Sequence, residues 1–260
     1  FTRSRDQELG RAALRAWNDW HLEEWVGAAP DRFIPLQLVW VNDPVVAAAD
    51  VRANAERGCR AVSFPENPVD LGLPPMIDPH WDPLLAACEE TGTVICLHNG
   101  SSAWSAARSP GAPLELYTSL FPVNALVTAA DWLWAKVPTR FPDIRIAFSE
   151  GGISWVPMLI DRITYVLDHS AVGAHGWDDP HVSPIDALRR NFWFCTIDIP
   201  PTMALYLIDA IYFRGKWQRQ FDPAQTRDQD FRRGDGTAQG GVYPLRSRFA
   251  MARDGPTAPR

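Results

Sequence analysis

The sequence has 260 residues, 46% of them hydrophobic, and a formal net charge of -6, which suits one large α/β domain with a sizeable core. No run approaches the roughly 18 apolar residues of a membrane-spanning helix, and the first residues are too polar for a secretory signal. Acidic residues outnumber basic ones before residue 213, which argues against nucleic-acid binding. We therefore expect neither a membrane nor a nucleic acid as partner.

The four cysteines are scattered through apolar segments and form no CxxC pair. This spacing favours buried, reduced thiols over a disulfide framework. Because reduced thiols suit a reducing compartment, we expect a cytoplasmic location.

The first quarter of the sequence predicts a helix, a strand and a second helix. In residues 6–25 apolar side chains recur every three or four positions, the spacing of an amphipathic helix. Residues 32–40 form an apolar run that suits a buried strand. The second helix is indicated from Asp43, a capping residue followed by Pro44, to Gly58, which should end it.

Strand and helix patterns then alternate to about residue 197. Strands are predicted at 59–65, 93–98, 143–150 and 191–197, and helices at 78–91, 122–136 and 153–169. This alternation is typical of a parallel sheet, and its spacing favours a (β/α) TIM barrel. An open doubly wound sheet is the alternative, weakened because no GxGxxG or GKS/T loop follows a strand. Five strands are fewer than the eight of a barrel, so we expect an incomplete one.

Polar residues follow four successive predicted strands, at the positions where α/β enzymes place their active sites. They are Glu66, Asn67, His98, Asn99, Glu150 and Asp198. His98 shares one face of its strand with Val94 and Cys96, so its imidazole should lie at the rim of that face. A neutral imidazole there can bind Zn²⁺, Mn²⁺ or Fe²⁺, and the competing interpretation is a hydrogen-bonded core histidine.

Two further residues near the predicted strand ends are candidates for the site. Glu150 suits a metal ligand or a general acid/base, or else a carboxylate that stabilises the start of a helix. Trp155 follows Glu150 closely enough to line a pocket, although a core position is the competing interpretation.

The order of motifs resembles a known family. The segments "NAERGCRAVSFPENP", "DPHWDPLLAACEETGTVICLHNGSS" and "FPDIRIAFSEGGISWVPMLIDR" are similar to the amidohydrolase-related family, in family order over roughly residues 10–200. The family comprises metal-dependent TIM-barrel hydrolases and decarboxylases and includes aminocarboxymuconate-semialdehyde decarboxylase. The resemblance implies a small organic substrate, a divalent metal, usually zinc, and a possible homo-oligomer.

The resemblance also implies roles for individual residues. His98 matches the metal-binding histidine of a middle strand, and Glu150 stands where many members have a catalytic histidine within "HGG". The remaining candidates are implied substrate contacts, namely Glu66, Asn67, Asn99, Trp155 and Asp198. The family's HxH pair is absent, and we expect the strand that carries it to precede Phe1 and the last barrel strand to be missing after Ile197. The metal site should therefore be incomplete.

A second resemblance follows the first. The segment "IDAIYFRGKWQRQFDPAQTRDQDF" (residues 208–231) resembles a segment of serpins, with Asp209 in place of the serpin asparagine. We therefore expect a partial amidohydrolase barrel at 1–205, a serpin-like segment at 206–231 and a loose, Gly- and Pro-rich tail at 232–260.

Three functions follow from these resemblances. The first is a metal-dependent hydrolase or decarboxylase impaired by the missing ligands. The second is a non-catalytic remnant or fusion product. The third, a protease inhibitor, is disfavoured because the serpin-like segment leaves no room for a reactive loop.

Overall fold

The computed structural model describes residues 1, 3–107, 109–169, 176–177, 179–196, 226–232 and 238–244. The chain divides into two compact units, Phe1–Leu207 and Ile208–Arg260, each of which is described by itself.

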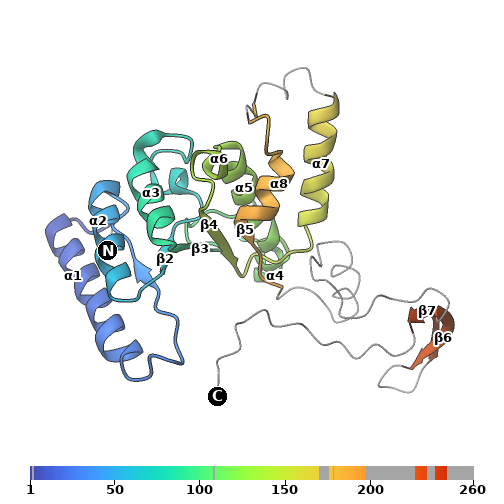
Figure 1. Ribbon diagram of the computed structural model, residues 1–260, viewed down its shortest axis with the longest axis horizontal. Helices are drawn as coiled ribbons and strands as arrows, with labels where there is room; N and C mark the ends of the chain where they lie inside the picture. The colour runs from blue at the N-terminus through green and yellow to red at the C-terminus, as the bar shows by residue number, and fades with distance from the viewer. Residues whose placement is uncertain are drawn as a thin grey trace, which may run out of the picture. The chain divides into compact units, whose positions relative to one another are not determined.

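The first unit is built on a five-stranded parallel sheet (Figure 1). Its strands are β1 (Gln37–Leu38), β2 (Ala61–Phe64), β3 (Val94–His98), β4 (Arg145–Ser149) and β5 (Phe192–Trp193). Each strand pairs with the next one along the chain, so the order in the sheet is the order in the sequence. A doubly wound sheet reverses its strand order at a switch point, whereas a TIM barrel does not. The described fold is therefore an incomplete (β/α) barrel, as predicted.

Helices connect the strands and lie along one side of the sheet (Figure 1). The longer ones are α1 (Gln7–Trp20), its π-helical extension η1 (His21–Val26), α2 (Pro44–Glu56), α3 (Asp82–Thr91), α5 (Phe121–Trp134), α7 (Val156–His169) and α8 (Pro184–Asn191). Short turns of helix complete the set, namely η2 (Pro68–Leu71), η3 (Pro79–Trp81), α4 (Leu114–Ser119) and α6 (Val137–Arg140). The sequence did not predict α4, α6 and α8. Among the described residues, no helix combines the length and the apolar character needed to cross a membrane.

Helix α2 shows how local sequence sets the boundaries of an element. The Asp43 carboxylate accepts hydrogen bonds from the backbone N–H groups of Val45 and Val46, at 3.0 and 3.1 Å. Pro44 occupies the first turn, where no backbone N–H is needed. Just past the helix, Gly58 has a φ of +87°, a left-handed conformation that suits glycine. These contacts explain why the predicted helix is found in place.

The two faces of the sheet differ in burial. One row of residues, with one member from each strand, faces the helices and is at most 5% exposed. It consists of Gln37, Val62, Ile95, Ile146 and Phe192. The adjacent row points to the other face and is only partly buried, or half exposed at Trp193. That row is Leu38, Ser63, Cys96, Ala147 and Trp193. Within the described part of the chain, helices thus cover one face, and the other corresponds to a barrel interior.

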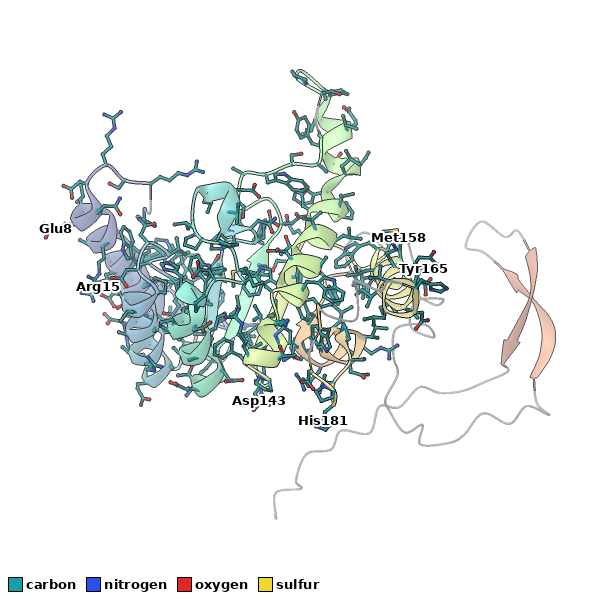
Figure 2. The ribbon with its side chains drawn as sticks, turned by 90° about the horizontal axis from the view of Figure 1, so that it is seen from above. Glu8, Arg15, Asp143, Met158, Tyr165 and His181 are labelled. Carbon is teal, nitrogen blue, oxygen red and sulfur yellow. The ribbon has the colours of Figure 1, made fainter. Side chains whose placement is uncertain are left out.

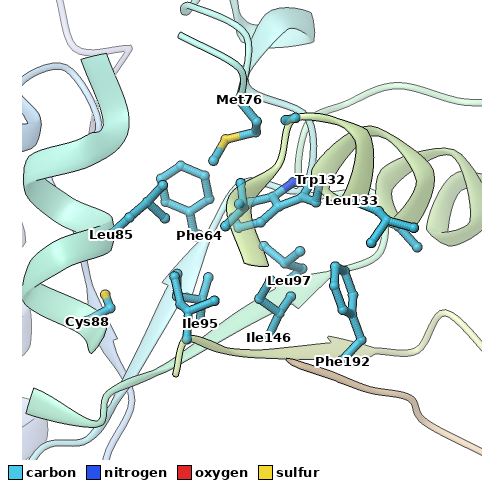
Figure 3. Close-up of a cluster of buried hydrophobic side chains, with 14 of the residues drawn as sticks. Phe64, Met76, Leu85, Cys88, Ile95, Leu97, Trp132, Leu133, Ile146 and Phe192 are labelled. Atoms are coloured by element: carbon cyan, nitrogen blue, oxygen red, sulfur yellow. The ribbon is translucent and has the colours of Figure 1, made fainter. Parts of the chain in front are cut away.

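The core lies between the sheet and its helices (Figure 3). Phe64 of β2 sits at its centre, with the rings of Trp81 and Trp132 packed edge-on at centroid distances of 5.1 and 5.6 Å. Edge-to-face pairs of this kind add to the stabilisation from burial alone. The core therefore ties β2 to α5, the helix that also approaches the carboxyl ends of the strands.

Strand β1 is shorter than the predicted 32–40. The N–H and C=O of Leu38 are paired with the side chain of Asn18, which is 4% exposed, at 2.8 and 2.9 Å. Pro35, which lacks a backbone N–H, cannot donate to a ladder. Val39, Trp40 and Val41 are buried, but only Gln37 and Leu38 pair with β2.

Replacing Asn18 by alanine should lower the free energy of unfolding by about 2 kcal/mol, because it leaves the two main-chain groups of Leu38 without partners. Urea denaturation of the full chain measures this loss. Glu8→Ala, on the exposed side of the same helix (Figure 2), is the control and should change stability by less than about 0.5 kcal/mol. Equal effects of the two substitutions would contradict the assigned role of Asn18.

The second unit contains a two-stranded antiparallel sheet of β6 (Thr226–Arg232) and β7 (Ala238–Pro244). Strand β7 lies inside the segment 232–260, for which the sequence predicted a loose tail. The partner strand belongs to the serpin-like segment, and the two strands satisfy each other's backbone groups in an antiparallel ladder. Weak local periodicity gave no sign of this pairing.

Candidate functional site

His98 and Glu150 meet where β3 and β4 end. In the ladder between these strands His98 pairs with Ser149, so Glu150 comes one residue later on the neighbouring strand. The imidazole Nε2 of His98 lies 3.4 Å from Oε2 of Glu150, and each side chain is 54% exposed. The structure therefore brings two predicted site residues together at a solvent-accessible position, while their roles stay predictions.

The contacts of the His98 ring fix its chemistry. Nδ1 lies 3.0 Å from the backbone oxygen of Asn99, and a carbonyl oxygen only accepts hydrogen bonds. Nδ1 must therefore carry a proton, which leaves Nε2 as the lone-pair nitrogen of the neutral ring, facing a carboxylate. The lone pair of Nε2 and the Glu150 carboxylate face each other across 3.4 Å, an arrangement that suits a shared cation.

The pair fits part of a metal site. Two ligands bonded to one ion at about 2.1 Å and near the tetrahedral angle lie about 3.4 Å apart, the separation found here. Imidazole nitrogen and carboxylate oxygen both suit zinc and manganese. Across the residues that the structure describes, however, no group of three His, Cys, Asp or Glu side chains is placed to hold an ion. His98 and Glu150 thus supply two donors, and the described residues do not complete the set.

The backbone at Glu150 is strained. Its φ of +58° is left-handed, which costs a residue with a side chain roughly 1 kcal/mol or more. Gly151 follows it in tight packing, because a Cβ there would lie 2.5 Å from the Cβ of Ala125 in α5. The carbonyl of Gly151 also accepts a hydrogen bond from Nε1 of Trp155, at 2.8 Å. Neighbouring groups thus hold Glu150 beside His98.

Replacing Gly151 by alanine should force β4 and α5 apart, lowering the free energy of unfolding by about 2 kcal/mol and moving Glu150 away from His98. The double variant Ala125→Gly/Gly151→Ala restores the space and should recover part of the loss. Denaturation of the wild type, both single variants and the double variant gives the interaction energy between the two positions. Strictly additive effects would show that the two residues are not in steric contact.

Trp155 lies in the core. It is 6% exposed and packs edge-on against Phe148 and Phe194, at ring-centroid distances of 6.4 and 5.2 Å. The indole donates to the carbonyl of Gly151 in this core position, and substrate contact by Trp155 stays a prediction. Trp155 contacts the segment that carries Glu150.

Glu66 is also buried, at 2% exposed. Its Oε1 accepts a hydrogen bond from the backbone N–H of Gly100 at 2.7 Å. Burial raises the pKa of Glu66 to about 7, against the opposing effects of backbone hydrogen bonds from Gly100 and Ser102 and of the nearby His98. The carboxyl group is thus occupied by the protein's own backbone, and substrate contact by Glu66 stays a prediction.

The two asparagines of the predicted site are buried as well. Asn67 accepts a hydrogen bond from Oγ1 of Thr128 at 3.2 Å. The backbone N–H of Asn99 donates a hydrogen bond to the backbone oxygen of Ser149 at 3.1 Å. The side-chain amide of Asn99 donates one to the backbone oxygen of Phe121 at 2.7 Å. Asn99 therefore links the end of β3 to β4 and α5. Asp198, the remaining predicted substrate contact, lies outside the described residues.

Three residues that support this site were not singled out from the sequence, namely Ser101, Ser102 and Trp132. The two serine hydroxyls accept hydrogen bonds from the backbone N–H groups of Glu66 and Asn67, at 3.1 and 2.7 Å. The sequence signal was the Asn-Gly-Ser-Ser run after His98, since serines after an Asn-Gly turn often bond to backbone groups. Nothing in the sequence marked Trp132 as more than a core residue.

Comparison with models of known protein families shows which family the chain resembles. The model of the amidohydrolase family matches residues 4–211, which include β1 to β5 and the paired His98 and Glu150. The chain belongs to the amidohydrolase family. The serpin (serine protease inhibitor) model matches residues 194–242, a shorter segment that includes β6. Among curated proteins, none matches the chain.

Solved structures of amidohydrolase-family enzymes share the fold. The 5-carboxyvanillate decarboxylase of Sphingomonas paucimobilis is 23% identical with a TM-score of 0.62, over 81% of this chain and 62% of that chain. An amidohydrolase of Mycobacterium avium subsp. paratuberculosis K-10 is 26% identical with a TM-score of 0.60, over 78% and 53%. The 5-carboxyvanillate decarboxylase of Novosphingobium aromaticivorans, solved with manganese and 4-hydroxy-3-methoxy-5-nitrobenzoic acid, is 17% identical with a TM-score of 0.58, over 81% and 59%. The chain spans less than two thirds of the length of each.

Proposed function

We propose that this chain is a metal-dependent hydrolase or decarboxylase of small organic molecules, with its centre at His98 and Glu150 and with impaired turnover. The observation that carries the proposal is the 3.4 Å contact between Nε2 of His98 and Oε2 of Glu150 at the carboxyl ends of adjacent parallel strands. Active sites of this fold lie at that end of the sheet. Similarity to decarboxylases of hydroxylated aromatic acids favours a small carboxylated substrate.

In this proposal the two side chains have different tasks. His98 offers the lone pair of Nε2 to an ion, with its ring held by the oxygen of Asn99. Glu150, half exposed beside it, offers a carboxylate that binds the same ion or moves a proton to or from the substrate. A divalent ion, manganese as in a similar structure or zinc, would polarise a substrate carboxylate or lower the pKa of bound water. Impairment follows from having two donors rather than a full set among the described residues.

A turnover assay tests the proposal. The purified chain would be incubated with Mn²⁺ and with 5-carboxyvanillate or 2,6-dihydroxybenzoate, and release of CO₂ would be followed. We expect slow, metal-dependent turnover that His98→Ala and Glu150→Ala abolish, while the exposed Glu24→Ala leaves it unchanged. Equal turnover in wild type and His98→Ala would contradict the assigned centre.

The second candidate is a non-catalytic remnant of the family. It is favoured by the absence of a three-residue ligand group among the described residues and by a sheet face that no described helix covers. Complete lack of turnover with both substrates and with both Mn²⁺ and Zn²⁺ would support it over the first.

We also propose a cellular compartment and an oligomeric state for the protein. All four cysteines are free, two of them fully buried, which suits the reducing conditions of the cytoplasm. A homo-oligomer, which the resemblance to the family implies, belongs to the same proposal. Sedimentation of the purified chain measures that association.

A further inference from the structure

The buried carboxyl group of Glu66 has no part in the chemistry proposed above, yet its contacts lead to the turn that carries His98. Strands β2 and β3 are paired so that Phe64 lies opposite Leu97. Two residues farther along each strand, Glu66 therefore lies beside Asn99 and Gly100. At 2% exposed, Glu66 has its side chain enclosed between the two strand ends rather than directed to solvent.

Three hydrogen bonds tie the end of β2 to three consecutive residues after β3. Oε1 of Glu66 accepts from the N–H of Gly100 at 2.7 Å, and the backbone N–H of Glu66 donates to Oγ of Ser101 at 3.1 Å. The N–H of Asn67 donates to Oγ of Ser102 at 2.7 Å. Of these, only the first uses a charged side chain, and a charged acceptor makes it the strongest of the three.

The other side of Glu66 is fixed to the core. Its backbone oxygen accepts a hydrogen bond from Nε1 of Trp132 at 2.9 Å, and Trp132 is fully buried in α5. Oδ1 of Asn67 accepts from Thr128 of the same helix. The end of β2 is thus held to α5, so a group bonded to Glu66 is held to the core of the protein.

Contacts within the turn that follows β3 connect Glu66 to His98. The N–H of Ser101 donates to the backbone oxygen of His98 at 3.1 Å, and Gly100 takes a φ of +83° to close the turn. The ring of His98 is oriented by the oxygen of Asn99, which belongs to the same peptide group as the N–H of Gly100. Because a peptide group is planar and rigid, the bond from Glu66 to that N–H sets the direction of the oxygen that holds Nδ1.

We propose that Glu66 is a positioning residue, whose carboxylate fixes the Asn99–Gly100 peptide and thereby the tautomer and direction of the His98 imidazole toward Glu150. The biological meaning of this inference rests on the function proposed for the His98 and Glu150 pair. The two contacts on which it rests do not depend on a metal. They are the hydrogen bond from the N–H of Gly100 to Glu66 and the contact between the His98 ring and the oxygen of Asn99.

The test observes the His98 ring directly. Protein labelled with ¹⁵N-histidine, without added metal and at pH 8, would be studied by NMR spectra that correlate ring nitrogens with ring protons, with His98 assigned from His98→Gln. The wild type should show a single Nδ1–H tautomer. Glu66→Ala should average the two nitrogens between tautomers, whereas Glu66→Gln, whose amide oxygen still accepts from Gly100, should keep the wild-type pattern. In parallel, Mn²⁺ affinity should fall on the order of tenfold in Glu66→Ala and stay near the wild-type value in Glu66→Gln.

A folded Glu66→Ala variant with the wild-type pattern for His98 would overturn the inference. If Glu66→Ala does not fold, Glu66→Asp decides, because its shorter side chain withdraws the carboxylate from the N–H of Gly100. Averaging of the His98 nitrogens in Glu66→Asp supports the inference, and an unchanged pattern overturns it. The ring signals also separate this inference from the proposed function. If the wild type binds no Mn²⁺ but Glu66→Ala changes the His98 signals as expected, the proposed function is refuted and the inference stands.

Discussion

Trp132→Ala is expected to lower the free energy of unfolding by about 3 to 5 kcal/mol, the range for removing a large aromatic side chain from a core. The indole is fully buried, packs edge-on against Phe64 and donates a hydrogen bond to the backbone oxygen of Glu66. The substitution therefore leaves a cavity and an unpaired carbonyl together. Urea denaturation of the full chain measures the loss.

Two further variants separate these contributions. Trp132→Phe keeps a smaller aromatic ring and loses the hydrogen bond, so it should cost less than Trp132→Ala, about 1 to 3 kcal/mol. Trp193→Ala removes an indole that is 50% exposed on the sheet face that no described helix covers, and it should cost much less than Trp132→Ala. If Trp132→Ala lowers the free energy of unfolding no more than Trp193→Ala does, the placement of Trp132 in the core is contradicted.

Stability should also depend on pH through Glu66. Its pKa is about 7 in the folded chain, against an ordinary value of 4.5, so between these values the folded state holds a proton that the unfolded state has released. The contribution to the free energy of unfolding is therefore fully present below pH 4.5 and is lost as the pH rises through 7, by roughly 3 kcal/mol in total. Desolvation of the carboxylate is the main cause, and Asp70 adds to it while His98 opposes it.

The variant Glu66→Gln removes this titration while keeping an oxygen that accepts from Gly100. Denaturation midpoints measured from pH 4.5 to 8 should fall less steeply in Glu66→Gln than in the wild type. Glu24→Gln, which neutralises an exposed carboxylate, is the matched control and should follow the wild-type curve. Parallel curves for Glu66→Gln and the wild type would show that the Glu66 carboxyl has an ordinary pKa.

Elements bounded by local chemistry could be predicted from the sequence. The cap at Asp43, the proline after it and the glycine that ends α2 act within a few residues, so their pattern is visible in the sequence. The same holds for the positions of His98 and Glu150, because each directly ends or follows an apolar strand. Helix α8 has a comparable local signal, since Ser183 accepts a hydrogen bond from the N–H of Asp186 as an N-cap.

Features that depend on contacts between distant segments could not be predicted in this way. The backbone groups of Leu38 in β1 are paired by Asn18, twenty residues earlier in the chain. Trp155 packs into the core against Phe194, 39 residues later in the chain, and sequence proximity to Glu150 does not specify that direction. Glu66 follows a strand as an active-site residue would, yet tertiary packing encloses it.

Titration of the full chain with Mn²⁺ by calorimetry tests most directly the central claim, that His98 and Glu150 share one cation site. The claim predicts one weak site per chain, with an affinity at least roughly a hundredfold lower in His98→Ala, since even outer-shell partners contribute up to that factor. His181→Ala, which removes an exposed histidine elsewhere (Figure 2), should bind as the wild type does. Mn²⁺ binding of equal strength in His98→Ala and the wild type would contradict the claim.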